Sequence, residues 1–224
     1  MSQPRHKLSK DLEALEREFR ASIIAVRGAR PPRAEGRAQE ILKVAHDMMC
    51  ESDFEKFSVR EVASRVGISL ASIQYHYATR AKLLNEMIEF RLDQYEDSLL
   101  EYVCRLARNP ETAFLTTIDW FLDDAWSEET ASFSFHFWGL AQRDENASQS
   151  LSRYQKVYRD FLGLLVRNLN PATSRIEASA RGALLSSLID GTMPIASAGK
   201  QAFPELAGLR DSVKRTALQI ATAN

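Results

Sequence analysis

The 224-residue sequence has little of what several protein classes require. Its two cysteines, Cys50 and Cys104, lie far apart and outside any paired spacing, so neither a disulfide framework nor a zinc site is indicated. No apolar run approaches the roughly 20 residues that a membrane helix needs, and the N-terminus alternates charged and apolar residues, unlike a signal peptide. We therefore expect a cytoplasmic protein with no metal and no membrane partner.

Catalytic motifs are also missing. The sequence contains no Gly-x-Ser-x-Gly element, phosphate loop, dinucleotide fingerprint or paired-His metal motif. The adjacent carboxylates Asp123 and Asp124 would point about 100° apart on a helix, so they are not expected to share a substrate. The sequence favours a protein that is not an enzyme and that needs no cofactor.

The composition is that of a folded globular protein, with 45% hydrophobic and 26% charged residues. The net charge of -1 is unevenly distributed, because residues 1–40 carry nine Lys and Arg against six Asp and Glu. This basic excess permits a nucleic-acid contact near the N-terminus but is too small to establish one. Whether the chain binds a nucleic acid therefore has to be judged from a sequence motif.

Apolar residues recur with helical periodicity along the whole chain, and Gly and Pro fall between the periodic segments. The pattern predicts an all-α fold. The helices are expected at 36–51, 58–66, 69–77, 79–107, 110–126, 129–144, 146–168, 173–198 and 205–222. Asn109-Pro110 and Asn170-Pro171 are expected breaks, and Pro194 should kink or end the helix that contains it.

The first 34 residues are predicted to form an extra helix followed by a basic arm. The helix is indicated by an apolar stripe of Leu8, Leu12, Leu15, Phe19, Ile23 and Val26, which needs a partner surface. Residues 27–37 then combine two prolines with several arginines, which predicts a stiff cationic arm able to contact DNA. The alternative for this segment is a partly ordered tail.

The clearest motif lies between Ser58 and Tyr77. Ser58 and Glu61 have the spacing of a capping box, in which each side chain bonds the backbone of the other residue. Ala63 is small enough for a second helix to cross closely, and Gly67 can adopt the turn conformation that a side chain resists. The spacing predicts a helix-turn-helix, with Ser69 capping the second helix.

The second helix of this motif has a polar face. Ile73 and Tyr77 are expected to point inward, since they are four residues apart. The outward face would present Ala71, Ser72, Gln74, Tyr75 and His76. Gln can pair with adenine and Ala can contact a thymine methyl, which suits a major groove. The alternative is an ordinary helical hairpin with a polar surface.

Residues 36–88, with SVREVASRVGISLASIQYHYATRAKLL at their centre, resemble the DNA-binding domain of the TetR family of bacterial transcription regulators. The resemblance covers about a quarter of the chain. It implies a three-helix DNA-binding head at 35–80 and a larger helical body at 81–224 for ligand sensing and dimerisation. Residues 1–34 lie outside the resemblance.

The resemblance also implies roles for single residues. Ser58 and Arg60 match phosphate-contacting positions, and Arg80 replaces the usual Lys at the start of the next helix, where the helix dipole also favours a phosphate. Gln74 departs from the Tyr that the family most often has, and Asp53 departs from a common Gly. The expected DNA-binding set is Ser58, Arg60, Ser69, Ala71, Ser72, Gln74, Tyr75, His76 and Arg80.

Two further sites are expected in the body. A cluster of aromatic residues suggests a ligand pocket walled by Trp120, Phe121, Phe133, Phe137, Trp138 and Met193, and the alternative is that these side chains are core. Two apolar stripes rich in small residues suggest a dimer interface that includes Ala180, Leu184, Leu188, Leu209, Val213 and Ala217. Intramolecular core is the alternative there too.

These expectations combine into one hypothesis. The chain is predicted to be a sequence-specific DNA-binding transcription regulator, acting as a homodimeric repressor that a small hydrophobic or aromatic ligand releases from a palindromic operator. The alternative is a helical interaction protein of the same fold that has lost DNA binding or ligand sensing.

Overall fold

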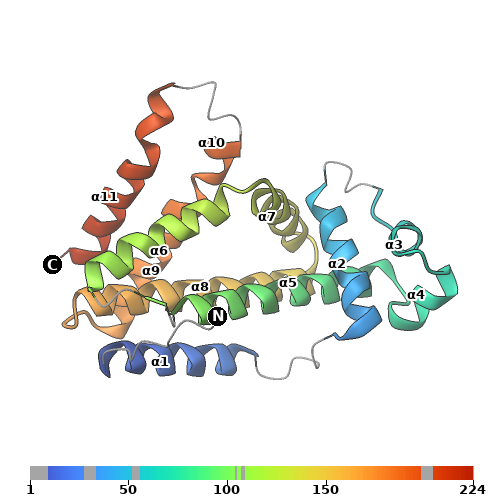
Figure 1. Ribbon diagram of the computed structural model, residues 1–224, viewed down its shortest axis with the longest axis horizontal. Helices are drawn as coiled ribbons and strands as arrows, with labels where there is room; N and C mark the ends of the chain where they lie inside the picture. The colour runs from blue at the N-terminus through green and yellow to red at the C-terminus, as the bar shows by residue number, and fades with distance from the viewer. Residues whose placement is uncertain are drawn as a thin grey trace, which may run out of the picture. The chain divides into compact units, whose positions relative to one another are not determined.

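The computed structural model describes residues 10–27, 34–51, 56–103, 105–106, 109–197 and 204–223. Within these ranges every regular element is helical, which confirms the all-α prediction (Figure 1). None of the described helices combines the length and the apolar character that a membrane crossing requires.

The chain divides into two compact units. We call Ala29–Tyr95 with Ser127–Tyr154 the head unit, and Met1–Gly28 with Glu96–Trp126 and Gln155–Asn224 the body unit. The head unit contains α2 (Gly36–Cys50), α3 (Val59–Val66), α4 (Leu70–His76), α7 (Glu128–Ala141) and the first parts of α5 (Arg80–Val103) and α8 (Glu145–Leu169). The remainders of α5 and α8 belong to the body unit.

The other elements of the body unit are α1 (Lys10–Arg27), α6 (Pro110–Ala125), α9 (Arg175–Asp190), α10 (Met193–Ser197), the 3₁₀ helix η2 (Pro204–Gly208) and α11 (Leu209–Thr222). Helix α6 begins as predicted, because Pro110 occupies its first turn and the Asn109 side chain accepts the backbone N–H of Thr112 at 2.9 Å.

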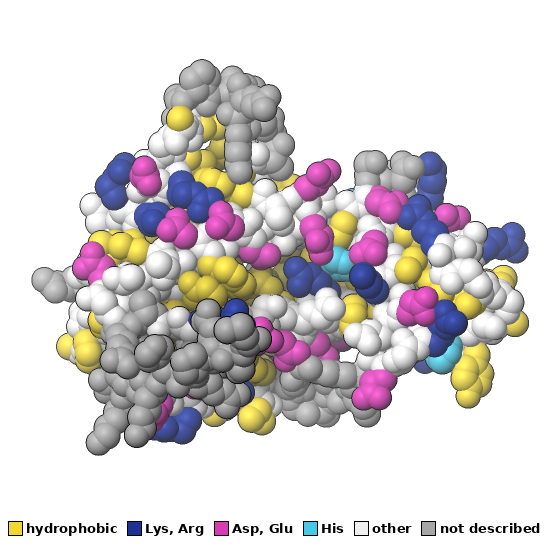
Figure 2. All heavy atoms as spheres, in the orientation of Figure 1, with side chains coloured by type: hydrophobic (Ala, Val, Ile, Leu, Met, Phe, Trp, Pro, Cys, Tyr) yellow, Lys and Arg dark blue, Asp and Glu magenta, His cyan; other side chains and the backbone are white. Residues whose placement is uncertain are grey.

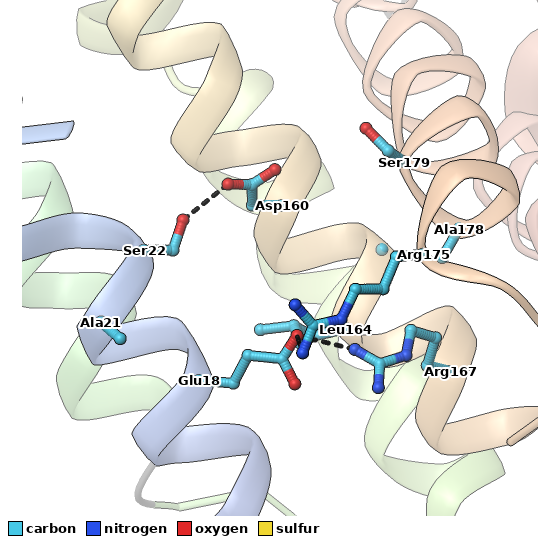
Figure 3. Close-up of a pocket in the computed structure, with 10 residues that line it drawn as sticks. Glu18, Ala21, Ser22, Asp160, Leu164, Arg167, Arg175, Ala178 and Ser179 are labelled. Atoms are coloured by element: carbon cyan, nitrogen blue, oxygen red, sulfur yellow. Dashed lines mark hydrogen bonds and ion pairs between the residues drawn. The ribbon is translucent and has the colours of Figure 1, made fainter. Parts of the chain in front are cut away.

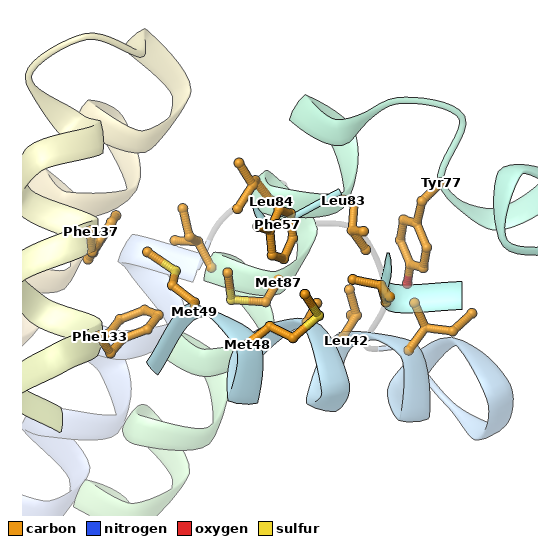
Figure 4. Close-up of a cluster of buried hydrophobic side chains, with 14 of the residues drawn as sticks. Leu42, Met48, Met49, Phe57, Tyr77, Leu83, Leu84, Met87, Phe133 and Phe137 are labelled. Carbon is orange, nitrogen blue, oxygen red and sulfur yellow. The ribbon is translucent and has the colours of Figure 1, made fainter. Parts of the chain in front are cut away.

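A single apolar core holds the head unit together. Leu42 and Met49 of α2 and Met87 of α5 are fully buried in it. Figure 4 shows Phe133 and Phe137 of α7 directed toward the same cluster. Because α3 and α4 are only eight and seven residues long, they depend on this packing for their helical state.

The N-terminal extra helix forms and packs within the body unit. Phe19 and Ile23 of its predicted stripe are buried, and the Phe19 ring lies 4.9 Å from that of Phe161 on α8. The Ser22 hydroxyl donates to Asp160 at 2.6 Å. Residues 28–33, most of the predicted basic arm, lie outside the described residues.

Helices α8 and α9 approach each other very closely, at positions occupied by glycine. A Cβ on Gly182 would lie 2.4 Å from the backbone oxygen of Arg159 and 3.1 Å from the backbone nitrogen of Gly163. A Cβ on Gly163 would lie 3.0 Å from the Ala178 oxygen. Backbone atoms cannot rotate away, so these contacts require glycine.

Helix α11 is fastened to α9 by both apolar and polar contacts. Val213 and Ala217 are buried within the chain itself. The buried Arg181 guanidinium donates to the Ala221 carbonyl at 3.2 Å, near the end of α11, and pairs with Glu177 at 2.9 Å. A cation at this position also suits the negative end of the helix dipole.

The helix expected at 173–198, which Pro194 was predicted to kink or end, stops earlier, at Asp190, and α10 starts at Met193. The backbone N–H of Thr192 turns back to the Ile189 carbonyl at 3.0 Å. Pro194 then lies in the first turn of α10, where its missing N–H removes no helical hydrogen bond. Likewise, η2 precedes α11 in the segment predicted as one helix at 205–222.

The close contact of α8 with α9 leads to a stability prediction. Gly182→Ala should lower the free energy of unfolding by about 1–3 kcal/mol, because the new methyl group forces two backbones apart. Gly139→Ala is the control: nothing lies within 4 Å of a Cβ on α7 there, so the helix should gain up to about 1 kcal/mol. Urea titrations of both variants and the wild type measure the difference, and equal midpoints would contradict the assigned contact.

Candidate nucleic-acid interface

Helix α3 starts at the predicted cap. The Ser58 side chain accepts the backbone N–H of Glu61 at 3.1 Å. The reciprocal half of the predicted capping box is wrong, since the Glu61 carboxylate pairs with Arg65 at 3.3 Å instead. An oppositely charged side chain one turn further along the helix offers a stronger partner than the backbone of the cap residue.

The turn between α3 and α4 requires Gly67. This residue has φ 75° and ψ 34°, the left-handed conformation that a side chain disfavours. The backbone N–H of Ile68 donates to the Ala63 carbonyl at 3.0 Å, which closes the end of α3. The predicted helix-turn-helix is confirmed at this point of the chain.

Helix α4 is capped by Ser69, as predicted. The Ser69 hydroxyl accepts the backbone N–H of Ser72 at 3.1 Å, and the two hydroxyl groups lie 2.9 Å apart. Both hydroxyls are therefore oriented at the exposed start of α4.

The two faces of α4 differ as the spacing predicted. Ile73 and Tyr77 are buried in the core of the head unit, whereas Ala71, Ser72, Gln74 and Tyr75 are exposed. The Tyr75 side chain is 87% exposed, and its ring meets that of the half-buried His76 edge-on at 5.3 Å. The exposed Tyr75 side chain offers both an aromatic face and a hydroxyl group to a partner.

The cations around this motif are in different electrostatic states. The Arg65 guanidinium pairs with Glu51 at 2.6 Å as well as with Glu61, and these carboxylates raise its pKa. Arg60 is exposed and has no ion pair with any described residue. Arg80 is exposed, although its Nε donates to the Phe57 carbonyl at 3.0 Å and its guanidinium lies over the Phe57 ring.

The surface over α3 and α4 carries charges of both signs. Figure 2 shows basic and acidic side chains interspersed there. Such a surface favours selective contacts from a few cations over a strong nonspecific field. Arg60, which is exposed and has no ion pair with a described residue, is better placed than Arg65 to contact a phosphate, because two carboxylates already bind Arg65.

Comparison with known proteins supports the helix-turn-helix assignment. Residues 41–87 match the family model of bacterial regulatory proteins, tetR family. The matched residues lie within the head unit and include α3, α4 and the turn at Gly67. A comparison with curated proteins gives no match.

Solved structures extend the TetR-type similarity over most of the chain. A TetR transcription regulator from Haloarcula marismortui has a TM-score of 0.67 at 18% identity, covering 83% of this chain and 96% of that one. A transcriptional regulator from Rhodococcus sp. has a TM-score of 0.65 at 26% identity, with the same coverage. A protein assigned as a transcriptional regulator from Saccharomonospora viridis, in complex with choline, has a TM-score of 0.65 at 16% identity, covering 84% and 96%.

The six residues predicted to wall a ligand pocket lie in two separate groups. Phe133 and Phe137 belong to the core of the head unit, and Trp138 is half-buried on the same helix. Trp120 and Phe121 belong to the body unit, where Phe121 contacts the Tyr158 ring at 4.7 Å. Met193 is also buried in the body unit. A pocket walled by these residues stays a prediction.

The predicted dimer-interface residues differ in exposure. Ala180 and Leu184 are exposed on α9, and Leu188 is half-buried. On α11, Leu209 is half-buried, whereas Val213 and Ala217 are buried within the chain. Ile176, which has the spacing of the α9 stripe, is 86% exposed. Among the residues predicted for the interface, the exposed ones thus lie on α9.

Sequence reasoning missed a polar cluster in the body unit. The Trp126 indole donates to the Thr192 hydroxyl at 2.8 Å, and the Arg210 guanidinium lies 4.8 Å from the centre of a Trp126 ring. Burial raises the pKa of Asp190 to about 7, and the negative charge of Asp124 contributes. These contacts join three segments that are distant in the sequence, so residue spacing contained no signal for them.

A buried histidine links α2 to α7 inside the head unit. The His46 ring lies 5.3 Å from that of Phe133, and its Nε2 lies 3.9 Å from a Glu129 oxygen. Burial lowers the pKa of His46 below its ordinary value, and the positive charge of Arg91 lowers it further. The neighbouring carboxylates of Glu129 and Asp47 oppose this shift without cancelling it. The folded environment of His46 therefore favours the neutral form of its ring.

The lowered pKa predicts how the stability of the head unit depends on pH. The unfolded chain binds a proton at His46 near pH 6.5, before the folded chain does, so folding stability should fall as the pH drops below that value. His46→Gln should make the melting temperature less sensitive to pH between about 7 and 5. At pH 7.5 both proteins are uncharged at this position, so the difference between their melting temperatures at that pH measures the change in packing alone. The same pH slope in both proteins would contradict the assignment.

Proposed function

We propose that this chain is a sequence-specific transcription regulator that binds a palindromic operator as a homodimer and acts as a repressor. One observation carries the proposal: the outward face of α4 leaves Gln74 and Tyr75 in solvent while Ile73 and Tyr77 anchor the helix from the opposite side. Exposed amide and aromatic groups on a rigid helix are suited to reading base edges.

The DNA-contacting residues would act in two ways. Arg60 and Arg80 would bind phosphates and set the register of the head on the duplex, as would the hydroxyl of Ser58. Ser69, Ala71, Ser72, Gln74, Tyr75 and His76 would face the groove. Two heads would then occupy successive major grooves, about 34 Å apart along the duplex.

We further propose that residues 35–80 form the DNA-binding domain and residues 81–224 a domain for dimerisation and ligand sensing. Ile176, Ala180 and Leu184 are spaced four residues apart and share one exposed face of α9. A second copy of the chain would remove this apolar face from water. Val213 and Ala217 would support the interface by holding α11 against α9 from inside.

A small hydrophobic or aromatic effector would control DNA binding. The aromatic residues Trp120 and Phe121 of α6 supply apolar surface for it within the body unit, and a protein of similar fold from Saccharomonospora viridis forms a complex with choline, a small organic molecule. Helices α5 and α8 each belong to both units, which gives a covalent route between body and head. To release DNA, the effector must bind more tightly to the conformation that cannot bind the operator.

The alternative function is a helical interaction protein that keeps the fold without reading DNA. The near-neutral charge of the chain favours this alternative, because nonspecific attraction to DNA is then weak. The exposed face of α4 favours the regulator, as does Arg60, which forms no ion pair with a described residue. We also propose that the protein is cytoplasmic and not an enzyme.

Selection from random duplexes tests the proposed function. The full chain should retain a palindromic sequence, with a dissociation constant on the order of 10⁻⁸ to 10⁻¹¹ M. Arg60→Ala should weaken binding to every duplex and reduce its salt dependence, whereas Tyr75→Ala should change the sequence that is selected. Aromatic compounds added to the bound operator should then release it.

Arg65→Ala is the matched control, because two carboxylates already occupy that guanidinium. It should weaken operator binding less than Arg60→Ala does. Failure of the wild-type chain to enrich any sequence would favour the interaction protein. Equal losses on all sequences for Arg60→Ala and Tyr75→Ala would remove Tyr75 from the base-reading set.

The dimer proposal predicts that Leu184→Arg yields monomers. A charge placed in an apolar interface would be buried without a partner, so association should fail while the fold persists, because Leu184 is 59% exposed in the single chain. Ile24→Arg on α1 is the control, since Ile24 is 71% exposed and lies outside the proposed interface. Sedimentation velocity measures both, and unchanged dimers of the Leu184 variant would place the interface elsewhere.

A further inference from the structure

A groove of about 430 Å³ lies between α1, α8 and α9 in the body unit. Its volume falls in the range of small-molecule sites. Gly163, Ala21 and Ala178 line part of the groove, and their small side chains leave this space open. One wall is α1, which lies outside the segment that matches the TetR family model. The groove is therefore a feature of this chain beyond its TetR-type head.

Two arginines converge at one end of the groove (Figure 3). Arg167 donates to the Glu18 carboxylate at 2.7 Å, and Arg175 lies 3.4 Å from the same oxygen. Two positive charges thus share one negative charge. The Arg175 side chain is 78% exposed and its contact with Glu18 is long, so its guanidinium can turn toward a ligand.

The other end of the groove carries a hydrogen-bond acceptor, the Asp160 carboxylate. Asp160 receives the Ser22 hydroxyl and the Lys156 ammonium, each at 2.6 Å, and both bonds end on Oδ2. Its Oδ1 is therefore able to accept a further donor. Asp160 and Arg167 are seven residues apart on α8, which places their Cα atoms about 10 Å apart along the helix axis.

We propose that this groove binds a small organic carboxylate that carries an ammonium or hydroxyl group about 10 Å from its carboxylate. The carboxylate would bind Arg167 and Arg175, since a guanidinium offers several donors in a planar fork. The donor at the far end would reach Asp160, and the apolar middle would cover Leu164 and Ala178. A ligand with a doubly charged phosphate is disfavoured, because Glu18 and Asp160 would repel it.

The competing explanation is that the Glu18 cluster merely fastens α1 to α8 and α9. In that case replacing the arginines would change the stability of the protein without changing the binding of any ligand. The exposure of Arg175 separates the two explanations. Its exposed ion pair with Glu18 contributes little to stability, whereas its guanidinium can contribute strongly to the binding of a ligand.

Isothermal titration calorimetry on the full chain with 8-aminooctanoate tests the site, with octanoate and octylamine as comparison ligands. The aminocarboxylate should bind saturably and more tightly than either comparison ligand. Arg175→Gln should weaken this binding by roughly ten- to a hundredfold, the loss expected for one charge-assisted hydrogen bond. Ser179→Phe, which fills the groove from an exposed position, should abolish it.

Arg215→Gln is the matched control, because Arg215 is exposed on α11 and is not among the groove residues. It should bind 8-aminooctanoate as the wild type does. Three results would overturn the proposal: no saturable binding to the wild type, wild-type binding by both groove variants, or a melting temperature lowered by Arg175→Gln without any change in binding. None of these measurements uses DNA, so the result is independent of the proposed regulator function.

Discussion

The burial of Ile73 and Tyr77 in the core of the head unit decides what the rest of this unit can do. Helix α4 has seven residues, too few to be stable in water by itself, so these two anchors determine both its existence and its orientation. Once they are buried, Gln74 and Tyr75 must face solvent. Gly67 permits this arrangement, because its left-handed conformation turns the chain sharply enough for α4 to pack beside α3.

The body unit depends on close packing of a different kind. Gly163 and Gly182 bring the backbones of α8 and α9 together, and Arg181 joins α9 to the end of α11. Small residues at a helix crossing and a buried guanidinium on a carbonyl leave little tolerance for change. The exposed α9 face and the groove beside α1 lie on this tightly packed frame, which suits surfaces that must hold their shape when they bind.

Local features were predictable because they depend on neighbours in the sequence. The cap at Ser58, the turn at Gly67 and the helix start at Pro110 each involve residues within four positions of one another. Most helix boundaries agree with the predictions for the same reason. The break before Pro194 was misplaced by a few residues, since proline restricts the residue before it and leaves the exact end of the preceding helix to packing.

The helical fold, the helix-turn-helix and the outward side of α4 follow from the sequence alone, because periodicity, caps and turn residues act over one or two helical turns. In contrast, the pairing of Arg65 with Glu51, the burial of His46 against α7 and the groove of α1 with α8 and α9 arise only in the folded chain. These outcomes depend on segments that are distant in the chain. Charge state and burial follow from such contacts, and spacing along the sequence does not encode them.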